Sequence, residues 1–522
     1  MLSAGLIPVY LLVTLVRGTR MPFGDYFYML SSIFAPDGAF TPGGLLVHAN
    51  EHLIAIPKLV FAVNVRLFDG SNITLSVFVW LVSLATLLLV AWCLRSFLRG
   101  RTTRQVVLIW LLVATCFPLS AMHNYVYGMS GSAWILANMF AVGAIALGVR
   151  GLTLTSGAAG VLATFTYGTG LAVWPALVLL LILRRSRPNW RDGAMLTMGL
   201  LAVWVERATR DIVYGHPLPI WNPMVVVRSL SISVGSFFTG SLDVALMAGL
   251  GMLIWFIFAL RVLLPRTLTR PEMFIVGMGA YALAALLMMA VSRSAFGDDT
   301  FTVSRYMAVV GVFVLSLGVL GLFVWGDARS WPWITAFGVS LTLVAAVPTI
   351  DHFREVVREQ DVAAVAVRLG VAEGYLRGFE AGSGALLQTL GNYPFDGGSG
   401  PDCGLLGAQV PTRLVRSDQV NGTVDNVSAA ANGRAVNVSG WAYSARPIQC
   451  VLILDAQGTV IGAGVRGIPR QDVRVAFRFP VSDVGWEGVA ARREGTQIRA
   501  GVVLKDSQEI FLLGDGLPVQ VP

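Results

Sequence analysis

Long apolar stretches recur along the first two thirds of the chain and end near residue 349. Each holds about 17 to 25 mainly apolar residues, enough for a helix to cross the ~30 Å hydrocarbon core of a bilayer. The pattern predicts a polytopic α-helical membrane domain over residues 1–349, with about eleven transmembrane helices. The predicted spans are residues 2–16, 73–94, 105–121, 132–149, 152–168, 171–184, 193–212, 241–263, 272–291, 304–325 and 332–349.

The pattern changes after residue 349, where charged residues appear every few positions. Residues 350–400 begin with apolar and charged residues alternating at helical spacing, which predicts a helical connector. Residues 401–522 contain short Val-rich runs such as VNVSGWAYS and IRAGVVL, separated by Gly, Asp, Asn and Ser. Such runs are typical of strands joined by turns, so we expect a β-sandwich-like domain.

The composition agrees with a membrane location. Of the 522 residues, 55% are hydrophobic and 13% are charged. The mean hydropathy of +0.69 is higher than that of ordinary soluble domains. Nearly all of the positive charge is arginine, since Lys58 and Lys505 are the only lysines. This bias favours a bacterial source.

Arginines are concentrated in three short loops, at residues 95–104, 184–191 and 261–270. Basic loops of membrane proteins face the cytoplasm, and the alternation of the predicted spans puts all three loops on that side. The N-terminus is then cytoplasmic, and residues 350–522 lie outside. This distribution explains the basic excess without a nucleic-acid partner, and it predicts a multi-pass protein of the bacterial inner membrane.

The cysteines divide by location. Cys93 and Cys116 lie in apolar segments, as inert buried thiols do, whereas Cys403 and Cys450 both belong to the C-terminal domain. If that domain is outside the cytoplasm, the second pair is a candidate disulfide. The chain has no metal-ligand spacing of His and Cys, no P-loop and no dinucleotide fingerprint. We therefore expect neither a metal nor a cofactor.

Polar residues that could take part in catalysis or ligand binding are concentrated in the loops predicted to be outside. The first of these loops contains FGDYFYMLSSIF, with Asp25, and HANEHLIAIPK, with Glu51. Apolar residues at helical spacing after Glu51 predict a helix in the membrane interface. The other outer segments are HNYVYGMS, YGHPLPIWNP and SRSAFGDDTFTVSRY. The candidate catalytic and binding residues are thus predicted to lie on one face of the membrane.

This layout resembles the GT-C superfamily of membrane glycosyltransferases. The similarity rests on an acidic residue after the first span, a long first outer loop with a second carboxylate, and an outer C-terminal β-domain. R-x-x-F-G followed by S-R-Y within residues 292–306 also looks like bacterial members. The first loop has a single Asp25 where many members have an acidic pair. The resemblance implies a polyprenyl-phosphate-linked sugar donor, a cell-envelope glycan acceptor and membrane lipid as partners.

The chemistry of such a transfer suggests roles for these residues. A hydroxyl acceptor needs a carboxylate to take its proton, and Asp25 is the first candidate, with Glu51 sharing that role or orienting substrate. A polyprenyl phosphate leaving group needs a fixed cation, such as Arg293 or Arg305. The candidate substrate-binding residues are Asn50, His52, Lys58, His123, Asn124, Trp221, Arg293, Arg305 and Tyr306.

Other interpretations remain open at the sequence level. Glu51 is equally suited to capping the interfacial helix, and both arginines to pairing with the acidic residues of their own loop. Trp441 and Tyr443, joined by Trp486, are candidates for stacking on sugar rings, although single aromatics in β-domains are more often core. A transporter or flippase of a lipid-linked saccharide and a non-enzymatic envelope scaffold are the alternative functions.

Overall fold

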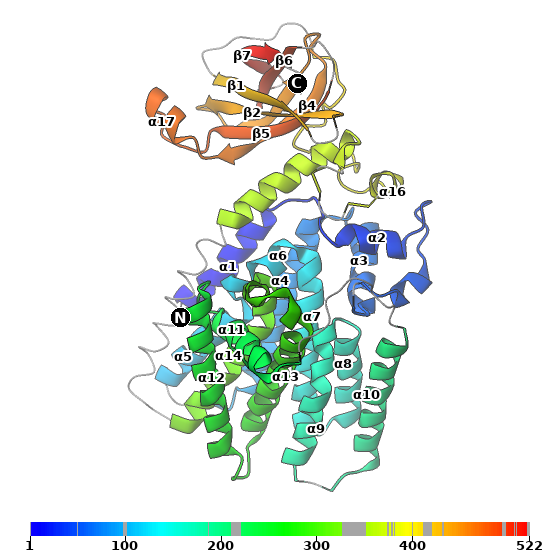
Figure 1. The fold of residues 1–522 in the computed structure, drawn as a ribbon, viewed down its shortest axis with the longest axis vertical. Coiled ribbons are helices and arrows are strands. Elements are labelled where there is room, and N and C mark those ends of the chain that lie inside the picture. Colours follow the sequence, from blue (N-terminus) through cyan, green and yellow to red (C-terminus); the bar gives the residue numbers. More distant parts are fainter. Residues whose placement is uncertain are drawn as a thin grey trace. The chain divides into compact units, whose positions relative to one another are not determined.

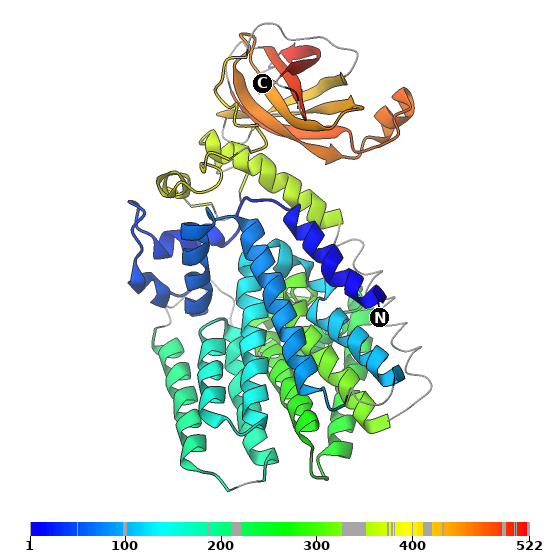
Figure 2. The ribbon, with the colours of Figure 1, turned by 180° about the vertical axis from the view of Figure 1, so that it is seen from behind.

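The computed structural model comprises two compact units (Figures 1 and 2). The helical unit is Met1–Gly18, Thr41–Val63 and Asn72–Phe353, and the sheet unit is Thr19–Phe40, Asn64–Ser71 and Arg354–Pro522. The residues that the structure describes are 2–49, 51–97, 102–185, 187–209, 221–325, 351–372, 375–376, 379–380, 382–398, 400–410, 420–430, 433–492, 497–505, 507 and 509–518.

The helical unit is a bundle of helices joined mostly by short loops. Its α-helices are α1 (Leu2–Val16), α3 (Ala55–Leu67, ending in the sheet unit), α4 (Asn72–Cys93), α5 (Thr102–Cys116), α6 (Met122–Val126), α7 (Gly128–Val149), α8 (Thr153–Thr164), α9 (Val173–Leu183), α10 (Trp190–Ala208), α11 (Pro223–Gly235), α12 (Leu242–Leu263), α13 (Arg270–Arg293) and α14 (Met307–Trp325). Its 3-10 helices are η1 (Pro42–Leu46), η2 (Leu119–Ala121), η3 (Gly168–Ala172), η4 (Ser294–Phe296), η5 (Asp298–Thr302) and η6 (Ser304–Tyr306).

Six helical segments among the described residues are long and apolar enough to cross a membrane, which agrees with a helical membrane protein. They are Asn72–Cys93, Gln105–Val126, Gly128–Val149, Leu242–Leu263, Arg270–Phe296 and Ser304–Trp325. The count of about eleven is not confirmed. Two predicted spans correspond to α8 and α9, of 12 and 11 residues, which are shorter than the ~20 residues that a full crossing needs. The predicted span at 332–349 lies outside the described residues.

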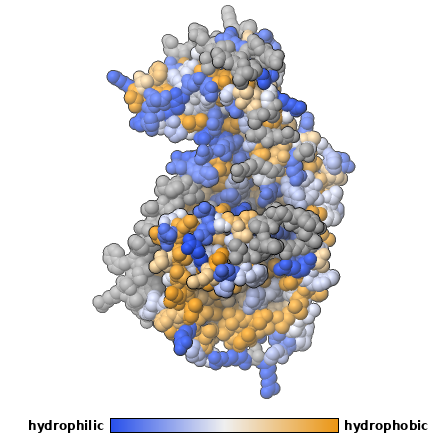
Figure 3. Space-filling view, in the orientation of Figure 1, coloured by the Kyte–Doolittle hydropathy of each residue, from blue (hydrophilic) through white to orange (hydrophobic). Residues whose placement is uncertain are grey.

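The surface of the helical unit carries a band of apolar side chains (Figure 3). On α10, Leu200 is 73% exposed and Trp204 is 66% exposed, and on α12, Met247 is 70% exposed and Ile254 is 66% exposed. Exposing so many apolar side chains to water costs free energy. Contact with lipid tails does not, because the tails are as apolar as these side chains. The band is therefore the surface that contacts the hydrocarbon core.

Helix α11 was not predicted from the sequence. Its 13 residues are too few to cross a bilayer, so a search for spans passes over it. The Asn222 side chain caps it by accepting a hydrogen bond from Met224 N at 2.9 Å. It lies directly against α12, because a Cβ at Gly235 would be 1.8 Å from Ala245 O and one at Gly249 1.8 Å from Ser231 O. Glycine permits this close packing, as in other membrane bundles.

The sheet unit is built around one antiparallel sheet of seven strands in the order β1-β2-β5-β4-β3-β6-β7. The strands are β1 (Val420–Ala429), β2 (Ala435–Ser444), β3 (Ile448–Leu454), β4 (Val460–Ile468), β5 (Gly485–Ala491), β6 (Gln497–Leu504) and β7 (Ile510–Pro518). The sheet curls nearly into a barrel, so that a Cβ at Gly422 in β1 would lie 2.7 Å from the Leu513 side chain in β7.

A single curled sheet replaces the two facing sheets expected of a β-sandwich. Alternating apolar residues are typical of both architectures, and only strand order distinguishes them. Inward-facing residues form one apolar core around Trp486, which is fully buried. Trp486 therefore has no face for a sugar ring. Trp441, at 8% exposure, is also mainly buried.

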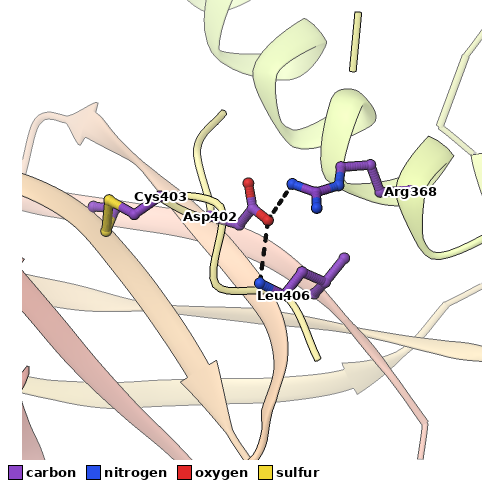
Figure 4. The surroundings of a disulfide bond; sticks show 5 residues. Arg368, Asp402, Cys403 and Leu406 are labelled. Atoms are coloured by element: carbon purple, nitrogen blue, oxygen red, sulfur yellow. Dashed lines mark hydrogen bonds and ion pairs between the residues drawn. A yellow bond between two sulfur atoms is a disulfide. The ribbon is translucent and has the colours of Figure 1, made fainter. Parts of the chain in front are cut away.

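The outside of this sheet is covered by the predicted connector. A helix over residues 351–368 packs Val365 and Ala366 against Ala463 and Val489. The segment that follows is pinned to β3 by the Cys403–Cys450 disulfide, with Cα atoms 6.1 Å apart, which confirms that pairing. Beside it, Asp402 pairs with Arg368 and accepts a hydrogen bond from Leu406 N at 3.3 Å (Figure 4).

Two pieces of the first predicted outer loop also belong to the sheet unit. They include helix α2 (Tyr26–Ile33) and pack beside helix α16 (Ser383–Leu390). Arg20 pairs with Asp396, Tyr393 N donates to Asp69 O at 3.0 Å, and the Phe27 ring lies 4.8 Å from that of Phe379. The loop is thus divided between units: Asp25 lies in the sheet unit and Glu51 in the helical unit.

Candidate functional site

Glu51 and Arg293 form an ion pair at one end of the helical unit. Glu51 Oε2 lies 3.7 Å from Arg293 Nη2, and the two side chains are 16% and 20% exposed. This distance is within ion-pair range but longer than a hydrogen bond. Arg293 is the last residue of α13, which ends before Gly297 with its φ of +90°. The Arg293 guanidinium also lies over the Phe296 ring, 5.3 Å from its centroid.

An aromatic row runs beside this pair and consists of His52, Tyr167, Trp134 and Tyr306. The ring centroids are 4.7 Å apart between His52 and Tyr167, 4.4 Å between Tyr167 and Trp134, and 5.2 Å between Trp134 and Tyr306. Arg305 lies over the Tyr306 ring, 5.3 Å from its centroid. The row therefore begins at His52, the residue after Glu51 in the sequence, and has a second arginine, Arg305, at its other end.

Four separate segments supply these rings. His52 precedes α3, Trp134 lies in the first turns of α7, Tyr167 precedes η3, and Tyr306 ends η6. Flat aromatic faces hold the apolar faces of sugar rings and isoprenoid chains, and arginines hold phosphate. The arrangement therefore combines a carboxylate, two cations and two partly exposed rings, His52 and Tyr167, backed by the buried Trp134 and Tyr306, at the ends of membrane helices.

His52 is fixed by its backbone and by a glycine. Its N–H and C=O exchange hydrogen bonds with Ala49 at 3.1 and 3.0 Å. Its ring lies against Gly168, where a Cβ would be 2.4 Å from His52 Nδ1. Ile56 N donates to Phe165 O at 3.1 Å and ties the start of α3 to the same turn. The position of His52 therefore depends on residue 168 having no side chain.

Asn124 and His123 hold the segment that carries Arg305. Asn124 is fully buried, donates from Nδ2 to Arg305 O at 2.8 Å, and accepts from Ser130 Oγ at 2.8 Å. His123 N donates to Ser304 Oγ at 3.2 Å, and the His123 ring is stacked on Tyr127 with centroids 4.0 Å apart. The contacts of these two predicted substrate-binding residues position η6.

Lys58 is buried and engaged with the backbone. Its Nζ donates to Gly44 O and Val47 O, both at 2.7 Å. Burial lowers the pKa of Lys58 to about 8, because the charged form loses its hydration. Lys58 thus holds together the segment that leads to Glu51. The exposed Val63 and Leu67 on the same helix, at 51% and 70%, fit the predicted interfacial helix.

Asp25, Trp221 and Asn50 are the remaining candidates. Asp25 is exposed in the sheet unit, where it precedes α2 without a capping bond from its side chain. Trp221 is 79% exposed and comes directly before α11. Asn50 lies outside the described residues. Within the helical unit, the pair and the row therefore contain five of the predicted residues: Glu51, His52, Arg293, Arg305 and Tyr306.

Sequence reasoning missed Trp134, Tyr167 and Gly168. All three lie near the ends of predicted spans, but tryptophan and tyrosine are common at any membrane interface. Nothing in the local sequence distinguishes these aromatic residues from an ordinary interfacial belt. Their proximity to His52 and Tyr306 appears only when four distant segments come together.

Comparison of the chain with protein-family models, with curated proteins and with solved structures finds no match. Among the described residues, no group of three or more His, Cys, Asp or Glu side chains is placed to hold a metal ion. The sequence motifs and the geometry of the pair and the row are therefore the features that bear on function.

Proposed function

We propose that this protein is an inverting glycosyltransferase that moves a sugar from a polyprenyl-phosphate donor to a cell-envelope glycan. The observation that carries the proposal is the Glu51–Arg293 pair beside the aromatic row, at the ends of membrane helices. The motif R-x-x-F-G contributes Arg293, and S-R-Y contributes Arg305 and Tyr306. Both motifs that support the GT-C resemblance thus supply residues at this location.

Each element has a task in that reaction. Glu51 takes the proton of the acceptor hydroxyl as the new glycosidic bond forms. Arg293 or Arg305 stabilises the polyprenyl phosphate as the bond between sugar and phosphate breaks. Trp134 and Tyr306 of the aromatic row are buried, at 5% and 2% exposure, and pack behind the partly exposed His52 and Tyr167. The rings of His52 and Tyr167 support the sugar ring or the first isoprene units. Glu51 is mainly shielded from water and lies within ion-pair distance of Arg293, whereas Asp25 is exposed, so we assign the base to Glu51.

We place the reaction on the outer face of the bacterial inner membrane. Asn72, which begins α4, bonds Val126 O and Gly128 N, so α4 starts beside α7. Helix α9 starts after the turn against His52, and α13 ends at Arg293. The Arg-rich loops that follow α4 and α9 and precede α13 therefore lie at the opposite end of the helical unit. Basic loops face the cytoplasm, which directs the candidate site outward.

Purified protein in proteoliposomes provides the direct test. We expect it to consume at least one polyprenyl-phosphate-linked hexose or pentose, with release of polyprenyl phosphate and transfer to envelope glycan. A reporter that is active only outside the cytoplasm, fused at the C-terminus, should be active in cells. Movement of the intact lipid-linked sugar across the bilayer without bond cleavage would instead establish the transporter alternative, and an inactive reporter would reverse the orientation.

Gly168→Ala should lower turnover by about 10²-fold, the order of loss that a displacement of about 1 Å produces. An Ala Cβ at this position would be 2.4 Å from His52 Nδ1, so the His52 ring and the turn must move apart. Turnover of the lipid-phosphate sugar is the measurement, with thermal unfolding in detergent to show that the variant is folded.

Gly143→Ala is the matched control. It makes the same change in α7, where the nearest atom to a new Cβ is 4.0 Å away, in the Leu89 side chain. We expect unchanged turnover and equal or higher stability, because Ala favours the helix. A folded Gly168→Ala variant with wild-type turnover would remove His52 and the aromatic row from the mechanism.

A further inference from the structure

Between β4 and β5, the sheet unit carries a protruding segment that contains helix α17 (Gln471–Phe477). It stands out from the sheet in both views (Figures 1 and 2). Val475 is 76% exposed, Phe477 is 54% exposed and Val481 is 48% exposed. We call Val475, Phe477 and Val481 the apolar tip. Exposed large apolar side chains that lie together on a protrusion usually belong to an interaction surface.

The protrusion is held in place from below. Val473 of α17 is buried and packs with Trp441 and Val484. The Phe477 and Phe479 rings are nearly parallel, with centroids 5.5 Å apart, and Phe477 also lies 4.9 Å from Trp441. The apolar tip is therefore exposed although the segment that carries it is packed against the sheet.

The arginine at the base of the protrusion is paired with carboxylates, whereas the arginines near the apolar tip are exposed. Arg470 at the base is bound by Asp472, at 2.7 Å, and by Asp425. The charges of Asp472 and Asp425 are therefore balanced by Arg470. Arg474 and Arg478, four residues apart, are exposed on either side of Phe477. The tip thus combines apolar side chains with two outward cations.

We propose that the apolar tip inserts into an anionic lipid surface. Apolar residues flanked by arginines are the pattern by which peripheral segments enter the headgroup region, and each cation near an anionic surface strengthens the attraction. The sheet unit belongs to the same chain as the candidate spanning helices, so it is tethered to a bilayer and meets lipid at a high local concentration. A convex tip suits penetration, whereas a sugar or peptide ligand is bound in a concave site. The proposal is independent of the enzymatic one.

The test uses the full chain in nanodiscs, one copy per disc. A spin label is placed at Val475→Cys, with Cys93 and Cys116 replaced by Ala and the Cys403–Cys450 disulfide intact. In phosphatidylcholine with phosphatidylglycerol, we expect the label to become accessible to oxygen and shielded from a water-soluble nickel complex. A label at Ala456→Cys, exposed in the β3–β4 turn, should remain in water.

Further variants separate lipid insertion from other causes of shielding. Arg474→Glu with Arg478→Glu, or Phe477→Ser, should return the Val475 label to water. Two results would overturn the proposal. One is a Val475 label that stays in water with phosphatidylglycerol. The other is a label equally shielded in anionic discs, in phosphatidylcholine alone and in detergent, which would indicate a protein contact.

Discussion

Replacing Arg293 by Ala should lower turnover of the lipid-phosphate sugar by about 10²- to 10³-fold, the loss typical of removing one group that stabilises transition-state charge. Arg293 is 3.7 Å from Glu51 and partly shielded from water, so its charge acts on the reacting groups with less screening than at a free surface. Arg293→Lys should recover only part of the rate, because lysine has no planar fork for phosphate oxygens.

Arg228→Ala is the control for the loss of an arginine. Arg228 also pairs with a carboxylate, donating from Nε to Asp298 Oδ2 at 2.8 Å, but its side chain is 49% exposed on α11. We expect near wild-type turnover for this variant. If Arg293→Ala and Arg305→Ala are both fully active, neither arginine holds the phosphate. Lys58 is then no substitute, since its ammonium is buried against two carbonyl groups.

The fold class was predictable because it depends on local properties. Runs of apolar residues identify spanning helices wherever they occur, and short Val-rich runs identify strands. The Cys403–Cys450 pairing followed from the location of both residues in one domain. Strand order did not follow, because the inward and outward alternation of each strand is the same in a sandwich and in a curled sheet.

The candidate site was predictable only in part. Glu51 and Arg293 stand out in the sequence as polar residues of predicted outer loops, and the structure brings them together. The role of Asn124 was not visible, because a buried amide bonded to a distant backbone carbonyl has no local signature. The division of the first outer loop between two units depends on long-range contacts such as Arg20 with Asp396.

Glu51→Gln and Asp25→Asn together identify the base. Both changes keep the shape and hydrogen-bonding capacity of the side chain but remove its ability to accept a proton at neutral pH. Glu51→Gln should lower transfer by about 10²- to 10⁴-fold, the range of general acid–base contributions. The substituted side chain keeps its size and polarity beside Arg293, so the fold should persist, which thermal unfolding in detergent would verify.

Asp25→Asn should retain most of the activity, because Asp25 is an exposed residue before α2 whose side chain makes no capping bond to the helix. The two variants are compared at saturating lipid-phosphate sugar and acceptor, so that a change in rate is separated from a change in binding. An inactive Asp25→Asn beside an active Glu51→Gln would move the base to the sheet unit and restore the assignment that the sequence favours. Normal turnover in both would show that neither carboxylate takes the proton, and the general-base mechanism proposed here would be wrong.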